Sequence, residues 1–200
     1  MSEDQLAAGL VDVRTAIPDA VIDLRYATTD NFTGVQLYPA DARCLVHESA
    51  VAGLQEAAGQ LRDSGLLLVF WDCYRPHEAQ VLMFEVVPDP AWVASPKPYA
   101  TSHEAARSVD VTLAWAQATQ CDTQPIQGYC QLDMGTEFDE FSARANADAT
   151  EGLTAQQVQN RATLRLAMEA GGLTVYQGEW WHFDTWDAHV AHPHLNVPVN

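Results

Sequence analysis

The chain has 200 residues, which suits one domain spanning 1–200, because domains typically contain ~100–200 residues. Ten Lys and Arg residues against 27 Asp and Glu residues give a formal net charge of −17, which excludes a protein that binds nucleic acid through a basic surface. Hydrophobic residues form 48% of the chain, so a domain of this size can bury a core without a metal or disulfide to hold it. Any metal is therefore expected to serve function rather than folding.

Sequence features bearing on location point two ways. The longest apolar run, 66–71, is far shorter than the ~18 residues of a membrane span, so no span is predicted. The acidic start, Met-Ser-Glu-Asp-Gln, lacks the apolar run of a secretory signal and favours the cytoplasm. A periplasmic location is the alternative, if a signal was removed and Cys121 pairs with Cys130 across their Pro- and Gly-containing loop. Four reduced thiols are equally compatible with the spacing of the cysteines, and the sequence does not indicate an oligomeric state.

The first half of the chain contains three predicted elements. Apolar residues at three- and four-residue steps predict an amphipathic helix over 49–63, with Ser49 as its N-cap. The apolar run 66–71 predicts a buried strand. Pro76 fits the first turn of a further helix that reaches about Val87, because a missing amide hydrogen does no harm there.

In the second half of the chain, strands and one helix are predicted on either side of an irregular region. Residues 108–113, rich in Val and Thr, predict a strand, and 116–150 are polar and irregular. A helix is predicted over 154–170, where a threonine followed three residues later by a glutamine forms a capping box and two glycines end the helix. Two closing strands are predicted over 173–176 and 180–184. The fold class expected is α+β, with helices packed on a central, mainly antiparallel sheet.

Two candidate metal ligands are His103, shortly before the predicted strand 108–113, and Asp110 within it. His103 follows Ser102 and precedes Asp110 by seven residues. Zn²⁺ accepts imidazole nitrogen and carboxylate oxygen, and a catalytic zinc site usually has three protein ligands. On its own the pair is also compatible with a hydrogen-bonded histidine beside a strand carboxylate.

A third candidate is the segment Glu179-Trp180-Trp181-His182, whose tryptophans would keep its surroundings dry. On a regular strand Glu179 and His182 point to opposite faces, so both approach one metal only if the backbone bulges or turns. The alternative is an aromatic core strand with polar ends.

A competing metal candidate is the C-terminal cluster His189, His192 and His194. Its His-x-x-His-x-His spacing suits zinc or copper, but it lies in a Pro-containing tail without an obvious general base. We interpret it as a solvated tail, with a metal-storage role as the alternative.

Taken together, these motifs resemble the zinc D-alanyl-D-alanine dipeptidases of the VanX type, which are related to D,D-carboxypeptidases and to the hedgehog signalling domain. The resemblance covers nearly the whole chain. Besides the His103/Asp110 and Glu179/His182 motifs, it includes Asp23-Leu24-Arg25-Tyr26-Ala27-Thr28, Asp30-Asn31-Phe32-Thr33-Gly34, Asp72-Cys73-Tyr74-Arg75-Pro76 and Asp133-Met134-Gly135-Thr136-Glu137-Phe138-Asp139.

The resemblance implies a fold like that of the hedgehog domain and the D,D-peptidases, one Zn²⁺ per chain and hydrolysis of the small dipeptide D-Ala-D-Ala. It also implies roles for single residues: His103, Asp110 and His182 as zinc ligands, Glu179 as catalytic base, Arg75 beside the polarised carbonyl, and Asp139 with Thr101 at the substrate ammonium.

Two positions depart from the family pattern. Ala106 stands where the family usually has a glycine, which permits a positive φ that alanine tolerates poorly, and Ser108 replaces a usual alanine. Two alternatives remain open at this point. One is a D,D- or L,D-carboxypeptidase acting on longer cell-wall peptides. The other is a hedgehog-like zinc-bearing interaction domain, against which Glu179 and Arg75 argue, because a purely structural site needs neither.

Overall fold

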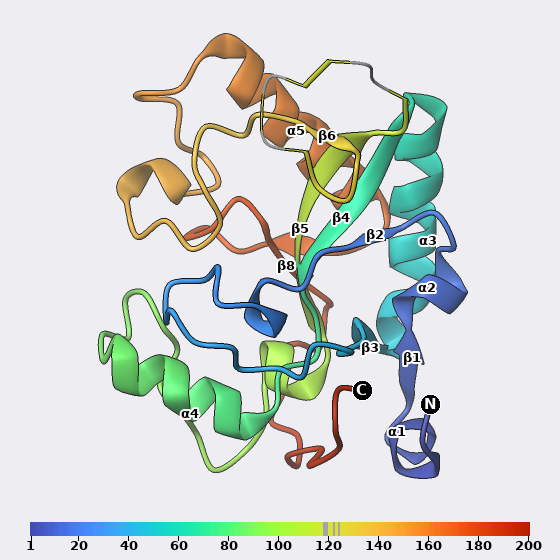
Figure 1. Cartoon of the computed structure of the whole chain (residues 1–200), viewed down its shortest axis with the longest axis vertical. Helices are drawn as coiled ribbons and strands as arrows, with labels where there is room; N and C mark the ends of the chain where they lie inside the picture. The colour runs from blue at the N-terminus through green and yellow to red at the C-terminus, as the bar shows by residue number, and fades with distance from the viewer. Residues whose placement is uncertain (118–119, 122, 124) are drawn as a thin grey trace.

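The computed structural model describes residues 1–117, 120, 121, 123 and 125–200. Within them, six strands form the main sheet in the order β2-β4-β5-β8-β7, with β6 also paired to β5, and β1 pairs with β3 in a separate small sheet (Figure 1). Only the β2–β4 pair is parallel. The prediction of an α+β fold with a mainly antiparallel sheet is therefore confirmed.

The strands are β1 Leu10–Asp12, β2 Val21–Ile22, β3 Leu45–His47, β4 Leu66–Asp72, β5 Ser108–Trp115, β6 Cys130–Gln131, β7 Thr174–Val175 and β8 His182–Asp184. The helices are α1 Glu3–Ala7, α2 Val13–Ala16, α3 Glu48–Asp63, α4 His77–Val86 and α5 Ala155–Ala170, with short 3-10 turns η1 Arg25–Ala27, η2 Ser102–Ala105 and η3 Ala143–Ala145. In the described part of the chain, every helix is too short or too polar to cross a membrane.

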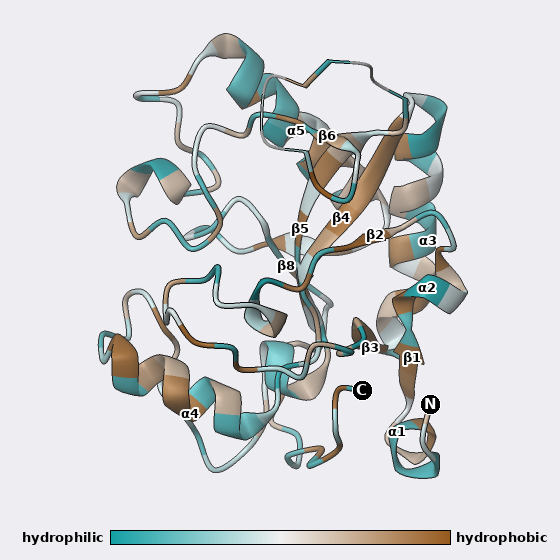
Figure 2. Ribbon diagram, viewed as in Figure 1, coloured by the Kyte–Doolittle hydropathy of each residue, from teal (hydrophilic) through white to brown (hydrophobic). Residues whose placement is uncertain are grey.

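The core is built on the antiparallel pair β4 and β5. All of β4 is buried, as is β5 up to its last residue, and Figure 2 shows β4 as a continuous apolar ribbon. Helix α3 packs on β4 and on α5. Gly53 of α3 and Gly171 at the end of α5 meet so closely that a β-carbon on either glycine would collide with the backbone carbonyl of the other. Strand β4, against which α3 packs, in turn holds β5, the strand that carries Ser108 and Asp110.

Several predicted element ends were wrong. Helix α3 begins at Glu48 instead of Ser49, because the Nδ1 atom of His47 accepts the hydrogen bond from the Ser49 amide and makes His47 the cap. Pro76 precedes α4 in an extended conformation, and the predicted strand 180–184 begins only at His182. The capping box of α5 is confirmed, with Thr154 as N-cap.

The first 47 residues contain short elements that lack a sequence periodicity, and none of these was predicted. The C-terminal segment runs back beside them: the Nε2 atom of Gln5 donates to the carbonyls of Pro198 and Asn200, and the Arg43 amide donates to Val199 (Figure 1). The two ends of the chain are thus held together next to β1 and β3.

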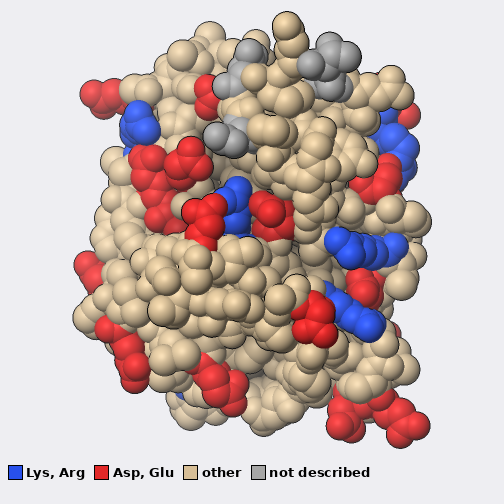
Figure 3. Space-filling model, in the orientation of Figure 1, with Lys and Arg blue, Asp and Glu red and all other residues tan. Residues whose placement is uncertain are grey.

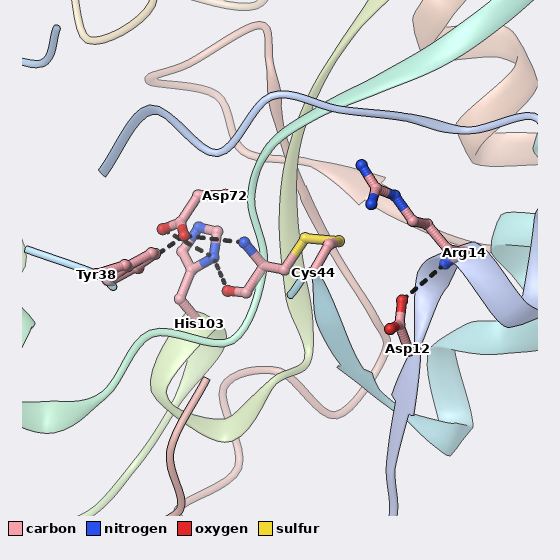
Figure 4. The surroundings of a disulfide bond; sticks show 7 residues. Asp12, Arg14, Tyr38, Cys44, Asp72 and His103 are labelled. Carbon is pink, nitrogen blue, oxygen red and sulfur yellow. Dashed lines mark hydrogen bonds and ion pairs between the residues drawn. A yellow bond between two sulfur atoms is a disulfide. The ribbon is translucent and has the colours of Figure 1, made fainter. Parts of the chain in front are cut away.

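Two disulfides are present, Cys44–Cys73 and Cys121–Cys130. The second confirms the local pairing considered from the loop between its cysteines. The first links the residue before β3 to the residue after β4 and lies beside Asp72 and His103 (Figure 4). Four reduced thiols, the alternative left open by the spacing, are not what the structure contains.

Candidate metal centre and substrate cavity

The pairing of β5 with β8 brings four polar side chains together. Asp110 lies opposite His182, and Ser108 lies opposite Asp184. Because alternate residues of a strand share a face, both residues of each strand point to the same side of the sheet. All four are buried, so this face forms a polar patch inside an otherwise apolar region.

His103 joins this patch from the turn η2. Its Nε2 atom lies 3.2 Å from Asp110 Oδ1 and 3.1 Å from His182 Nδ1, and the last two atoms lie 2.9 Å apart. Ligand atoms held at roughly 2.0–2.1 Å from a tetrahedral zinc ion are separated by about 3.3 Å. Two imidazole nitrogens and one carboxylate oxygen at this spacing fit a divalent metal ion.

The outer nitrogen of each ring has a hydrogen-bond acceptor of its own. His103 Nδ1 donates to the Cys73 carbonyl (2.8 Å; Figure 4), and His182 Nε2 donates to Asp184 Oδ1 (3.0 Å). The hydroxyl of Ser108 donates to the same carboxylate. Such contacts fix the ring orientation and leave the inner nitrogens free for a metal, as is usual for ligand histidines.

The charges of the group also suit a cation. Burial opposes ionisation of Asp110, but the neighbouring His103 and His182 lower the pKa of Asp110 well below its usual value. Burial likewise opposes a charged His182, yet hydrogen bonds to Asp110 and Asp184 raise the pKa of His182. Two buried carboxylates therefore hold positive charge at this position.

The turn that carries His103 has an unusual backbone. Ala106 adopts a left-handed conformation with φ of 56°, and Ser102 has φ of 52°. This is the conformation that the family's glycine permits. Here alanine adopts it, although the left-handed conformation costs a residue with a side chain about 1–2 kcal/mol. Hydrogen bonds hold the turn, because the Ala106 amide donates to the carbonyl of His103 and the His47 amide donates to Ala106.

Glu179 lies in the turn before β8, and not on the strand. Its Oε2 atom is 3.8 Å from His182 Nδ1, so the carboxylate approaches the group formed by His103, Asp110 and His182. The late start of β8 removes the opposed faces expected for a regular strand. Burial raises the pKa of Glu179 to about 7, although the positive charge of His182 works against the rise.

Arg75 is held rigidly beside this group. Its Nε and Nη2 atoms both donate to Asp72 Oδ2 (3.0 and 2.7 Å), and Nη1 donates to Gln80 (2.7 Å). Asp72 accepts a further hydrogen bond from the Tyr38 hydroxyl. The guanidinium also approaches the group of His103, Asp110 and His182, with Nη2 4.0 Å from Asp110 Oδ2.

A cavity of about 280 Å³ opens beside this group of side chains. The lining includes all seven residues proposed from the sequence: Arg75, Thr101, His103, Asp110, Asp139, Glu179 and His182. Pockets for drug-sized ligands begin at ~300 Å³, so this one suits a small molecule. Figure 3 shows one face of the molecule, where a basic side chain lies among several acidic ones near the middle.

Asp139 accepts a hydrogen bond from the Tyr26 hydroxyl at 2.7 Å. Burial raises the pKa of Asp139 well above its usual value, and the charges of Asp110 and Glu179 oppose its ionisation as well. A positively charged ligand would stabilise the ionised form of this buried carboxylate. Thr101 lies in the cavity wall at the start of η2.

The three tail histidines do not come together as one metal site. The interpretation as a solvated tail fits His189, whose side chain is 77% exposed, but not His192 and His194, which each have a buried ring nitrogen. His189 pairs with Asp184 (3.1 Å), and the backbone of His192 pairs with Ala100. His194 is only 18% exposed and contacts Glu104, beside His77.

Residues 6–200 match the D-Ala-D-Ala dipeptidase family of metallopeptidases. The chain belongs to this family. It is 35% identical to the D-alanyl-D-alanine dipeptidase of Escherichia coli K12, over 88% of this chain and 83% of the relative. The D-alanyl-D-alanine dipeptidases of Enterococcus faecalis and Enterococcus faecium are 28% and 27% identical, over 89% and 88% of this chain and 92% and 91% of their own lengths.

Some side chains of this dipeptidase-family site were missed from the sequence. Asp184 follows His182 by two residues, so a strand placed correctly from His182 would have put both on one face. Asp72 stands inside a motif noted for its arginine, and its bond to Arg75 needed the structure. Tyr26 reaches Asp139 across the fold, which no local pattern indicates.

Proposed function

We propose that this chain is a peptidase that hydrolyses D-Ala-D-Ala to two molecules of D-alanine, with one Zn²⁺ held by His103, Asp110 and His182. The observation that carries the proposal is the convergence of these three ligand atoms within 3.2 Å of one another, at a cavity that Glu179 and Arg75 also line. The names of the relatives support the substrate.

When bound, the zinc ion supplies Lewis-acid activation of a water molecule and of the scissile carbonyl. Glu179 is the proposed base: it takes a proton from water as the water oxygen bonds to the carbonyl carbon. It then delivers that proton to the amine that leaves when the C–N bond breaks. A pKa near 7 suits a group that must accept and release a proton at neutral pH.

Arg75 is proposed to stabilise the negative charge that develops on the carbonyl oxygen. Its guanidinium keeps its charge, and Asp72 and Gln80 hold its position before substrate arrives. Lysine has one nitrogen and could not replace the two, Nε and Nη2, that donate to Asp72 Oδ2.

Asp139 is proposed to bind the substrate ammonium, with Thr101 beside it, and so to select short substrates. A longer peptide has an uncharged amide where the dipeptide has its ammonium. Binding such a peptide would leave the Asp139 carboxylate desolvated and without a charged partner. Removing one partner of a buried ion pair typically costs about 3–5 kcal/mol.

The test is to incubate the zinc-loaded protein separately with D-Ala-D-Ala and with a pentapeptide ending in D-Ala-D-Ala, and to measure free D-alanine. Release from the dipeptide alone is expected. Release from the pentapeptide at a similar kcat/KM would favour the carboxypeptidase alternative, which the names of the relatives do not favour. No release from either would contradict the proposal.

We further propose that residues 1–200 act as one domain in an oxidising compartment such as the periplasm. The cavity takes side chains from Tyr26 to His189, and both cysteine pairs form disulfides, which persist in such compartments. The mass of thiol-alkylated protein from cells should show no alkylated cysteine before reduction. Four alkylated cysteines without reduction would instead support the cytoplasm.

A further inference from the structure

A second group of potential metal ligands lies next to the proposed catalytic centre, and the dipeptidase reaction has no use for it. It consists of His77 at the start of α4, Glu104 in η2 and His194 in the C-terminal segment. One ligand atom from each residue lies within 4.8 Å of the other two. Glu104 directly follows His103, so the two groups share one turn of backbone.

The ring of His194 is oriented toward this group. Its Nε2 atom donates to the Lys97 carbonyl (3.1 Å), so its Nδ1 atom carries a lone pair in the neutral ring. That Nδ1 atom is buried, has no hydrogen-bond partner, and lies 3.6 Å from Glu104 Oε1. A lone pair facing a carboxylate oxygen is unfavourable unless positive charge lies between them.

His77 completes the group. Its Nδ1 atom lies 2.6 Å from the same Glu104 oxygen, and its ring centroid lies 4.1 Å from that of His194. The side chains are 32%, 10% and 18% exposed for His77, Glu104 and His194, so an ion can reach them from solvent. Two imidazoles and one carboxylate are a ligand set that zinc accepts, with a fourth position left for water.

We propose that His77, Glu104 and His194 bind a second divalent transition-metal ion, Zn²⁺ by the chemistry of the donors. The ion would anchor the C-terminal segment to α4 and to the turn of His103. That segment already contacts the turn through its backbone, because the Ser102 amide donates to the Ala188 carbonyl and Ala100 pairs with His192. The metal would therefore brace one wall of the substrate cavity.

The experiment measures bound zinc per chain after metal removal, equilibrium dialysis against Zn²⁺ and elemental analysis. Wild-type protein is expected to hold two equivalents. His194→Gln should lose one, because its side-chain amide can still donate to the Lys97 carbonyl but offers no Nδ1 ligand. His192→Gln is the matched control on the same segment and should keep both. His182→Gln should lose the other equivalent, and the double variant His182→Gln/His194→Gln both.

Glu104→Gln gives a second, nearly isosteric test, and circular dichroism checks that each variant is folded. A folded His194→Gln or Glu104→Gln protein with the zinc content of wild type would overturn the proposal. So would equal loss of zinc from the His192→Gln control. Since the readout is bound metal, the result does not depend on which peptide the catalytic centre cleaves.

Discussion

Asp184 accepts a hydrogen bond at 3.0 Å from the Nε2 atom of His182, two residues before it on β8. Its carboxylate also receives the hydroxyl of Ser108 from the facing strand. If His182 is a zinc ligand as proposed, this carboxylate would orient its ring, and loss of such a partner lowers metal affinity by ~10–100-fold. Asp184→Asn is therefore expected to weaken zinc binding by about this factor while the ligand set stays complete.

Competition with a chelator of known affinity would measure this change. Ser108→Ala should weaken binding less than Asp184→Asn, because it loosens the carboxylate without removing it. Asp148→Asn is the control, since Asp148 pairs with Arg165 on the surface and is 68% exposed. Zinc affinity equal to wild type in Asp184→Asn would show that Asp184 does not orient His182.

Glu179→Gln separates metal binding from catalysis. Glutamine has nearly the same shape but cannot accept a proton from water, so turnover of D-Ala-D-Ala should fall by at least ~10²-fold, a typical contribution of a general base. Zinc content should not change, because Glu179 is not among the three converging ligand atoms. A variant that keeps more than about a tenth of the wild-type rate would contradict the assignment of the base.

Tyr26→Phe tests Asp139 through the pH dependence of substrate binding. Burial raises the pKa of Asp139, and the Tyr26 hydroxyl works against that rise by donating to the ionised carboxylate. As the pH falls through this pKa, Asp139 gains a proton and loses its attraction for the ammonium, so KM rises. Removing the hydroxyl raises the pKa further, and the rise in KM should begin at a pH higher by about 1 unit.

Phenylalanine keeps the ring that lies 5.3 Å from the Arg75 guanidinium, so Arg75 stays in place. Tyr38→Phe is the matched control, because its hydroxyl donates to Asp72 instead of Asp139. It can alter kcat through Arg75 but should leave the pH at which KM rises unchanged. If Tyr26→Phe leaves that pH unchanged or lowers it, Asp139 is not the group whose charge binds the substrate.

The parts of this site that lie in regular elements or fixed motifs could be predicted from sequence, and the parts made by distant contacts could not. His103 and Asp110 were candidates from their spacing and His182 from its Glu-Trp-Trp-His motif, and the family resemblance joined the three into one proposed ligand set. The placement of Glu179 needed the turn that precedes β8, which is set by tertiary contacts, such as the bond from the Trp180 amide to the Ala145 carbonyl.

Contacts between distant segments escaped sequence reasoning for the same physical reason. Cys44 and Cys73 are 29 residues apart, with no turn or spacing that joins them. They meet because the start of β3 lies beside the residues that follow β4, where the Tyr74 amide donates to the Leu45 carbonyl. His194 meets His77 through a tail without periodicity. The short strands β1 and β3 carry too few residues for an alternating pattern to stand out.

Gly53→Ala tests the packing layer beneath the site. Alanine is normally better than glycine inside a helix by ~1 kcal/mol, but here its β-carbon would strike the Gly171 carbonyl, an atom of backbone that cannot turn aside. Overpacking of this kind costs ~1–3 kcal/mol, so the free energy of unfolding should fall despite the better helix propensity. Urea unfolding monitored by circular dichroism would measure it.

Gly59→Ala is the matched control on the same helix, because a β-carbon there meets no atom within 4 Å. Only the helix propensity acts at this position, and the free energy of unfolding should rise by ~0.5–1 kcal/mol. The two substitutions are chemically identical and differ only in whether α5 lies against the helix. Equal stabilisation by both would mean that α3 and α5 do not meet at Gly53 and Gly171 in solution.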